Sequence, residues 1–145
     1  MQDGKAVQLL LNGEEHGHGH VVEKLLKRAE RLECLVAFAK ISAIGDLLKP
    51  LRKALEGGLK ARFAIGLDFY LTEPEALRQL FALAEKHALV LYLSNASDTF
   101  HPKIYAFQNG KQCSVIVGSA NLTATALGSG QDRTARHGQV SRMYW

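Results

Sequence analysis

The apolar and polar residues of this chain alternate in blocks that predict strands and helices in turn. Short apolar runs at residues 7–11, 34–39, 61–67 and 89–93 are typical of strands. The runs at 34–39 and 61–67 are continuous, which predicts strands buried on both faces. Between the strands, apolar residues recur with the helical period in three segments: Val21, Val22, Leu25, Leu26, Ala29 and Leu32; Ile44, Leu47, Leu48, Leu51 and Leu55; Leu77, Leu80, Phe81 and Ala84.

Glycine, proline and capping residues predict where these elements begin and end. Gly57-Gly58 should end the second helix, and Pro50 should kink or split it. Residues 72–75 read Thr-Glu-Pro-Glu, a capping box that should start the third helix. Asn109-Gly110 predicts a hairpin turn. Pro102 cannot donate to a sheet, so strand pairing should begin only after it.

The order of elements predicts an α/β fold. Strands alternating with helices and followed by a late hairpin indicate a three-layer α/β/α sandwich with a mixed sheet. Residues 1–127 are expected to form this one domain. Residues 128–145 change to a polar, glycine-rich composition and include Arg133, Arg136 and Arg142. We interpret them as a basic tail that is either disordered or the start of a truncated region.

Composition narrows the class of protein. A chain of 145 residues with 47% apolar residues can bury one core. The net charge of +4 favours a polyanionic partner such as nucleic acid. Cys34 and Cys113 stand alone in apolar runs, as expected in a reducing compartment. No signal peptide and no apolar run long enough for a bilayer is evident, so we expect a soluble, cytoplasmic protein that does not bind membranes.

Candidate chemistry concentrates in two adjoining segments. In the predicted strand 101–107, alternation places His101 and Lys103 on one face, which makes a plausible phosphate-handling pair. The apolar strand 114–117 runs into Gly118-Ser119-Ala120-Asn121, a turn that can offer backbone N–H groups, a hydroxyl and an amide to an anion. Together the segments offer a nucleophile, a cation and neutral donors to one phosphoryl group.

These residues resemble the HKD signature of the phospholipase D (PLD) superfamily, in particular its nuclease-type members in metal-independent restriction enzymes and beside helicase modules. The resemblance implies a PLD half-domain fold. It implies His101 as nucleophile or acid, Lys103 as the neutralising cation, and Ser119 and Asn121 as ligands of the phosphate oxygens. Position 108, where the usual signature has Asp, is Gln. Nuclease-like members often carry an acidic residue eleven positions after the Asn, where this chain has Asp132, so the resemblance implies Asp132 as the residue that orients His101, with position 108 as the other candidate place.

The resemblance also implies a mechanism without metal or cofactor. One histidine forms a phosphohistidine and a second protonates the leaving oxygen. The motif supplies one histidine per chain, and His87 and His137 lack matching neighbours, so we expect a homodimer that shares one site. The favoured function is a metal-independent DNA endonuclease, with a helicase or DNA-recognition module as a candidate partner. The alternatives are a phospholipid phosphodiesterase or phosphatidyltransferase, and a degenerate DNA-binding module.

Two further motifs leave alternatives open. His16, His18 and His20 alternate with glycine and could bind a metal ion if extended, although a flexible loop leading into a helix is the favoured interpretation. Asp68 follows a predicted strand directly. It either caps a turn, which we favour, or orients a catalytic group.

Overall fold

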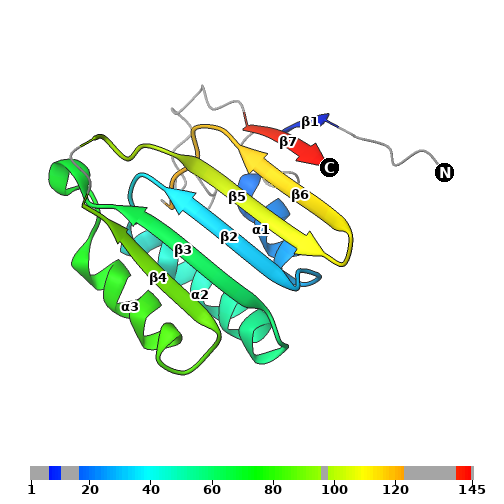
Figure 1. The fold of residues 1–145 in the computed structure, drawn as a ribbon, viewed down its shortest axis with the longest axis horizontal. Coiled ribbons are helices and arrows are strands. Elements are labelled where there is room, and N and C mark those ends of the chain that lie inside the picture. The colour runs from blue at the N-terminus through cyan, green and yellow to red at the C-terminus, as the bar shows by residue number, and fades with distance from the viewer. Residues whose placement is uncertain (1–6, 11–16, 96–97, 123–139, 145) are drawn as a thin grey trace.

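A seven-stranded mixed sheet organises the molecule (Figure 1). The computed structural model describes residues 7–10, 17–95, 98–122 and 140–144. Its helices are α1 (His18–Leu26), α2 (Ile41–Glu56) and α3 (Pro74–Ala84). Its strands are β1 (Val7–Leu10), β2 (Arg31–Val36), β3 (Lys60–Gly66), β4 (Leu89–Ser94), β5 (Lys103–Asn109), β6 (Gln112–Val117) and β7 (Val140–Tyr144).

The strand order is β1-β7-β6-β5-β2-β3-β4. Strands β2, β3 and β4 are parallel, whereas β5 runs antiparallel to β2, and β6, β7 and β1 continue antiparallel. The parallel strands are joined through α2 and α3, because a parallel connection needs a crossover. The predicted α/β fold with a mixed sheet is therefore confirmed.

Three helices cover one face of the sheet. Figure 1 shows α1 and α2 behind the strands, and α2 packs against both α1 and α3. Alternate residues of the strands are buried under these helices, among them Cys34, Phe63, Tyr105 and Ile116. The described residues contribute no helix to the other face, so a second helical layer stays a prediction.

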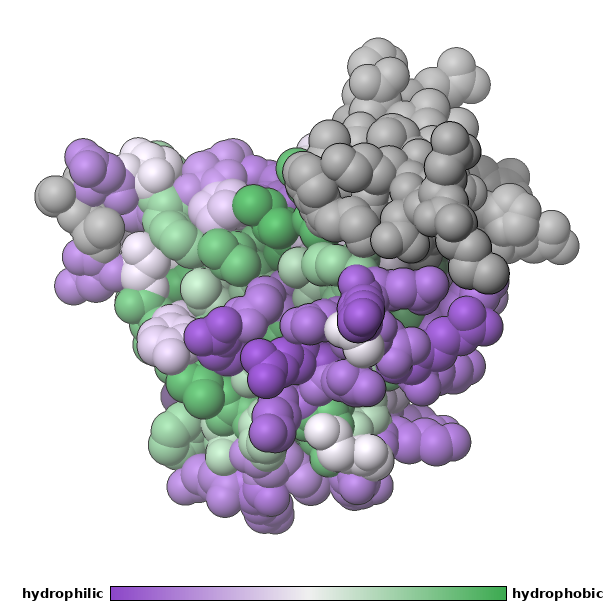
Figure 2. All heavy atoms as spheres, turned by 45° about the vertical axis from the view of Figure 1, so that its right-hand side comes forward, coloured by the Kyte–Doolittle hydropathy of each residue, from purple (hydrophilic) through white to green (hydrophobic). Residues whose placement is uncertain are grey.

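The other face of the sheet is partly exposed. In β2 and β3 the alternate residues that point away from the helices include Glu33 and Arg62, and Val90 and Tyr92 of β4 are about half exposed. Figure 2 shows apolar side chains next to a band of hydrophilic side chains that crosses the view. Among the described residues only one face of β2 and β3 packs against helices, so the prediction that these strands are buried on both faces is wrong.

The first helix differs from its prediction at both ends. It begins at His18, so His18 and His20 are helical and not part of a loop, and it ends at Leu26. Leu32, expected on the same helix, is instead a buried residue of β2. Leu32 fits both the helical period and the alternation of a strand. Its pairing with β3 and β5 in the sheet makes it a strand residue.

The second helix runs unbroken through Pro50, so the predicted split is wrong. An interior proline costs about 3 kcal/mol. Burial of a full apolar stripe, including Ile44 and Leu51, contributes about 1.5–3 kcal/mol per large side chain and exceeds that cost. The helix ends at Glu56, and Gly57 caps it, as predicted.

Several local predictions in the second half are confirmed. Strand β5 begins at Lys103, directly after Pro102. Gly110, with φ of 56°, turns the chain into β6. Cys34 and Cys113 are both free thiols, as expected, but only Cys34 is fully buried and Cys113 is half-buried.

Two other predictions fail. Phe81, expected to point inward from α3, is 57% exposed. The predicted polar tail contributes β7, which lies between β1 and β6 in the sheet, so the expectation of disorder is wrong for residues 140–144.

Within the described residues, no helix combines the length and apolar character needed to cross a bilayer.

Candidate active site

The predicted site lies at one end of the strands, along the edge of the sheet where the parallel strands terminate. Strands β2 and β3 end there, β5 begins there, and β6 returns there antiparallel to β5. In open α/β sheets the carboxyl ends of parallel strands form the usual ligand crevice. The segments that carry His101, Lys103, Ser119 and Asn121 all converge at this edge.

His101 and Lys103 are in direct contact. The Lys103 Nζ lies 2.8 Å from His101 Nδ1, and the same Nζ is 3.3 Å from the His101 carbonyl oxygen. The same Nζ is also 3.3 Å from His101 Nε2, and because an ammonium group can only donate, the tautomer of the imidazole decides which ring nitrogen accepts. His101 is exposed and Lys103 is half-buried. The imidazole is therefore open to a substrate while the cation is held beside it.

Partial burial lowers the pKa of the Lys103 ammonium below its ordinary value. The cause is loss of hydration, which disfavours the charged form. An anionic group bound beside Lys103 would offset this effect, because an opposite charge favours the ammonium.

The turn after β6 lies against the start of β5. The Gly118 N–H donates to the Lys103 carbonyl oxygen at 3.3 Å, which continues the β5–β6 register into the turn. Ser119, the next residue, is exposed. The buried Tyr105 hydroxyl donates to the Ala120 carbonyl oxygen at 3.0 Å and holds the turn from beneath. The structure thus brings Ser119 to the same edge as His101 and Lys103.

Asn121 has a structural contact that the sequence did not indicate. Its side chain is 5% exposed, and its Oδ1 accepts from the backbone N–H groups of Ala37 at 3.0 Å and Phe38 at 3.3 Å. It therefore ties the turn after β6 to the loop after β2. No described residue accepts from its Nδ2, which is the atom that the predicted phosphate contact requires.

Asp68 reaches the residue before His101. Its Oδ2 accepts from the Phe100 backbone N–H at 2.8 Å. The favoured interpretation of Asp68 as a turn cap is therefore incomplete, since the carboxylate holds the segment that delivers His101. The signal in the sequence was its place immediately after β3, at the carboxyl end of a parallel strand.

Gly66 is a second residue that sequence analysis missed. An added Cβ there would lie 2.4 Å from the Ala37 carbonyl oxygen and 3.0 Å from that of Phe100. Only glycine lets these two backbone segments approach so closely. A glycine as the last residue of a buried strand was the only available signal.

The predicted capping box is wrong, because its two capping residues, Thr72 and Glu75, bond elsewhere, Glu75 to Arg78 and Gln79. Thr72 Oγ1 donates to the Gly66 carbonyl oxygen at 2.7 Å and accepts from the Ala39 N–H at 3.3 Å. Glu73 Oε2 accepts from the Ile41 N–H at 2.6 Å, a contact that lowers the pKa of this carboxyl. Helix α3 consequently has no side-chain cap. Thr72 and Glu73 instead fasten the turn after β3 to the start of α2.

Two positions, 108 and 132, were predicted to carry the residue that orients His101, and their outcomes differ. Position 108 lies near the far end of β5, five residues beyond Lys103, and Gln108 bonds there to the Gly110 carbonyl oxygen at 3.2 Å. Five strand residues span about 17 Å, so a carboxylate at 108 could not orient His101 of the same chain. That part of the prediction is wrong. Asp132 lies outside the described residues, as does His137.

His18 is buried beneath the site and not available as a metal ligand. It is 1% exposed, its ring centroid lies 4.9 Å from that of Tyr105 in an edge-on contact, and no hydrogen bond reaches either ring nitrogen. Burial lowers the pKa of its imidazole to about 4. Across the described segments, no group of three or more His, Cys, Asp or Glu side chains is placed to hold a metal ion.

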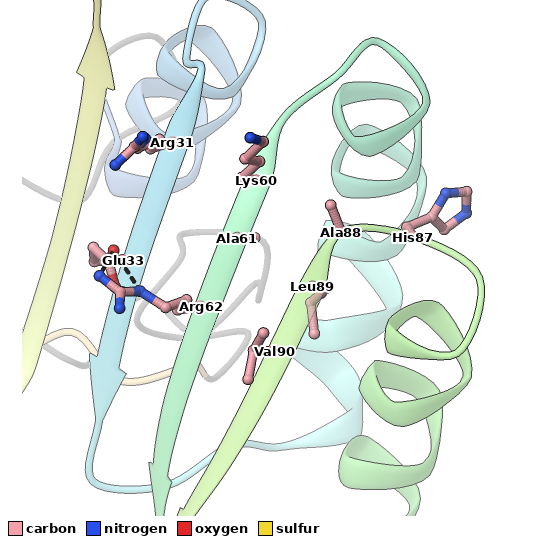
Figure 3. A pocket seen from close by; sticks show the side chains of 9 residues that line it. All are labelled: Arg31, Glu33, Lys60, Ala61, Arg62, His87, Ala88, Leu89 and Val90. Atoms are coloured by element: carbon pink, nitrogen blue, oxygen red, sulfur yellow. Dashed lines mark hydrogen bonds and ion pairs between the residues drawn. The ribbon is translucent and has the colours of Figure 1, made fainter.

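A basic hollow of about 500 Å³ lies at the opposite end of the strands (Figure 3). It is lined by Arg31, Glu33, Lys60, Ala61, Arg62, His87, Ala88, Leu89 and Val90. Figure 3 shows Arg62 reaching across to Glu33, and its Nε is 2.8 Å and 2.9 Å from the two carboxylate oxygens. Arg31 pairs in register with Gln108, so this hollow is about 17 Å along the strands from Lys103. His87 is therefore remote from His101.

Comparison with protein families finds one match, over residues 19–139, to the NgoFVII restriction endonuclease N-terminal PLD domain. The match covers the predicted site residues, including Asp132. Among curated proteins, no sequence matches this chain.

Solved structures share the fold. Nuc, a phospholipase D family member from Salmonella typhimurium, is 17% identical with a TM-score of 0.69, covering 98% of this chain and 84% of Nuc. NucT from Helicobacter pylori is 12% identical with a TM-score of 0.61, covering 97% of this chain and 86% of NucT. Phosphatidylserine synthase from Haemophilus influenzae Rd KW20 is 16% identical with a TM-score of 0.71, covering 100% of this chain but only 36% of the synthase.

Proposed function

Because this chain belongs to the family of the NgoFVII restriction endonuclease N-terminal PLD domain, we propose that it is a metal-independent DNA endonuclease acting through a covalent phosphohistidine. Family membership confirms the PLD resemblance and makes the chain a phosphodiester hydrolase of the nuclease type. The observation that carries the finer proposal is the 2.8 Å contact between Lys103 Nζ and His101 Nδ1 at the start of β5, where His101 is exposed.

The proposed reaction has two displacements at phosphorus. An unprotonated nitrogen of one imidazole attacks, the P–N bond forms, and the bond to the leaving oxygen breaks while a second imidazole gives that oxygen its proton. Water then attacks phosphorus, the P–N bond breaks, and the second imidazole takes the proton of the water. His101 supplies one of these two imidazoles.

Fixed donors stabilise the charge that develops on the phosphoryl oxygens. Lys103 is positioned beside His101, and Ser119 lies in the adjoining turn. Asn121 is held by its Oδ1, which leaves its Nδ2 to donate. Such preorganised donors act most strongly in the transition state. Asp132 is proposed to orient His101.

The second imidazole is proposed to come from another copy of the chain. His18 is buried against Tyr105 and His87 lies at the basic hollow, so neither can serve His101. A two-fold axis beside His101 would bring the two His101 side chains of a homodimer into one site.

The basic hollow supports a polyanionic substrate. Arg31 and Lys60 are register partners on parallel strands, and like charges placed opposite one another are unfavourable. A phosphodiester backbone across this hollow would relieve their repulsion. The hollow is about 17 Å from Lys103 along the strands, which equals about five base-pair steps at 3.4 Å each.

Cleavage of plasmid DNA in excess EDTA tests the proposal. We expect the parent chain to nick and linearise the plasmid without added metal, and His101→Ala to be inactive while still folded. His20→Ala is the matched control, because His20 is exposed on α1 and has no role in the site. Activity that disappears with EDTA and returns with magnesium would contradict the mechanism.

The same variants separate the alternative functions. Headgroup release from phospholipid vesicles by the parent chain, without DNA cleavage, would favour a phospholipid phosphodiesterase or phosphatidyltransferase. DNA binding without cleavage of either substrate would favour a degenerate binding module. Copurification would test a helicase or DNA-recognition module as partner.

A further inference from the structure

The turn that follows β3 presents two aromatic rings to solvent. Phe69 is 71% exposed and Tyr70 is 100% exposed. Both have positive φ, 58° for Phe69 and 55° for Tyr70, in a region that side chains of this size rarely adopt. A strained backbone that also leaves apolar rings in water persists only where the surrounding structure imposes it, and such strain gathers at ligand-binding sites.

The surroundings of this aromatic tip, Phe69 and Tyr70, do impose its conformation. On one side Asp68 accepts from the Phe100 N–H at 2.8 Å. On the other side Thr72 bonds to both the Gly66 carbonyl oxygen and the Ala39 N–H, and Glu73 accepts from the Ile41 N–H. The tip is consequently a rigid projection fastened at both ends.

The tip is next to the proposed catalytic histidine. Asp68, the residue before Phe69, is hydrogen-bonded to Phe100, the residue before His101. A ligand whose phosphate contacts His101 and Lys103 therefore has its adjoining groups close to the two rings.

We propose that Phe69 and Tyr70 form a stacking platform for an unpaired nucleobase beside the scissile phosphate, so that the site prefers single-stranded or locally melted nucleic acid. The inference rests on the proposed nuclease function. Aromatic side chains stack on any base, because every base has a π-face. In a duplex these faces are covered by neighbouring bases, so only an unpaired nucleotide can occupy the platform. The net charge of +4 complements the same polyanion.

Binding measurements on the uncleaving His101→Ala chain test the platform. Fluorescence anisotropy would compare a labelled 20-nucleotide single strand with a duplex of the same sequence. We expect Phe69→Gly and Tyr70→Gly each to weaken single-strand binding about tenfold, with little effect on the duplex. Tyr70→Trp should retain or strengthen single-strand binding. Phe81→Ala, which removes an exposed ring from α3, should change neither.

Thermal unfolding gives an independent readout. Glycine tolerates positive φ, so the two glycine variants should be as stable as the parent chain or more stable, while they lose affinity. A purely structural tip would show the opposite pattern, with lower stability and unchanged affinity, and that result would overturn the platform.

The other outcomes are also decisive. If the tip variants bind the single strand as tightly as the control while the parent chain still cleaves DNA, the platform is overturned and the proposed function stands. A change in oligomeric state or in vesicle binding, without a change in single-strand affinity, assigns the tip to a second copy or to a lipid surface and also overturns it. If the parent chain neither binds nor cleaves nucleic acid, the proposed function falls and the platform with it.

Discussion

The carboxylate of Asp68 accepts a hydrogen bond from the backbone N–H of Phe100 and thereby ties the turn after β3 to the segment that carries His101. The two residues are 32 positions apart in the sequence. The backbone of Gly66 also lies close to the Phe100 carbonyl oxygen, so the end of β3 and the turn after it both contact the residue before His101. The position of His101 therefore depends on a carboxylate from a distant turn.

Replacing Asp68 should impair turnover more than binding. We expect Asp68→Ala to lower kcat about tenfold, because His101 loses its position, and to destabilise the fold by about 1 kcal/mol, since a partly buried N–H loses its partner. Asp68→Asn keeps an acceptor oxygen and should restore most of the activity. Asp46→Ala, which removes an exposed carboxylate on α2, is the charge control. A fall in DNA affinity equal to the fall in kcat would refute the positioning role.

Lys103 should act on the transition state. We expect Lys103→Ala to lower kcat on the order of 10²–10³-fold, because the cation would face charge developing at one phosphate. DNA affinity should change little, since it is spread over many backbone contacts. Lys111→Ala removes an exposed cation from the β5–β6 turn and should leave kcat unchanged. Steady-state kinetics and equilibrium binding measure the two effects, and equal losses in both would mark Lys103 as an ordinary contact residue.

Two Asn121 variants separate its structural and catalytic contacts. Asn121→Ala removes the acceptor of the Ala37 and Phe38 N–H groups, so we expect lower stability by about 1–3 kcal/mol together with lower kcat. Asn121→Asp keeps that acceptor and loses the Nδ2 donor, so it should fold nearly as stably but still lose kcat. Chemical denaturation and cleavage assays give both quantities. Parental kcat in Asn121→Asp would remove Asn121 from the phosphate site.

Mixing subunits tests the shared site. If two chains combine their His101 side chains in one centre, a dimer with one His101→Ala subunit is inactive. After complete exchange between equal amounts of mutant and parent chain, roughly a quarter of the dimers are fully parental by random pairing. Activity should fall toward that fraction, whereas independent sites would leave roughly half. Activity that stays at half after exchange is verified by mass would exclude the shared site.

The buried His18 should make stability depend on pH. Its pKa is about 4 when folded against an ordinary 6.5, so between these pH values the unfolded chain binds a proton that the folded chain does not. Stability is therefore complete above about pH 6.5 and falls as pH drops toward 4. The loss from this group is on the order of 3 kcal/mol, at 1.36 kcal/mol per pH unit.

Paired denaturation curves at pH 7 and pH 4.5 measure this dependence. His18→Phe keeps an aromatic ring against Tyr105 and should flatten the dependence on pH. His20→Gln, on the exposed side of the same helix, should leave it as in the parent chain. A pH dependence that survives in His18→Phe would assign it to other groups.

The sequence by itself determined the local parts of the site. Strand alternation placed Lys103, Tyr105 and Phe107 on one face, and the structure buries Tyr105 and Phe107 under the helices on that face. The hairpin at Gly110 and the start of pairing after Pro102 also follow from neighbouring residues. These features depend on side-chain period and backbone preference within a few positions, so they could be predicted.

Tertiary structure decided what holds the site together. Asn121 bonds to Ala37 across 84 positions, and Thr72, which the local pattern assigned to a helix cap, bonds instead to Gly66 and Ala39. The strand at residues 140–144 exists as a partner of β1 and β6 although its composition suggested a tail. A polar side chain near a turn has several possible partners of similar energy, and only the packing of distant segments selects among them. The neighbouring placement of His101 and Lys103 was thus predictable from the sequence, whereas the bonds that support these residues are a property of the fold.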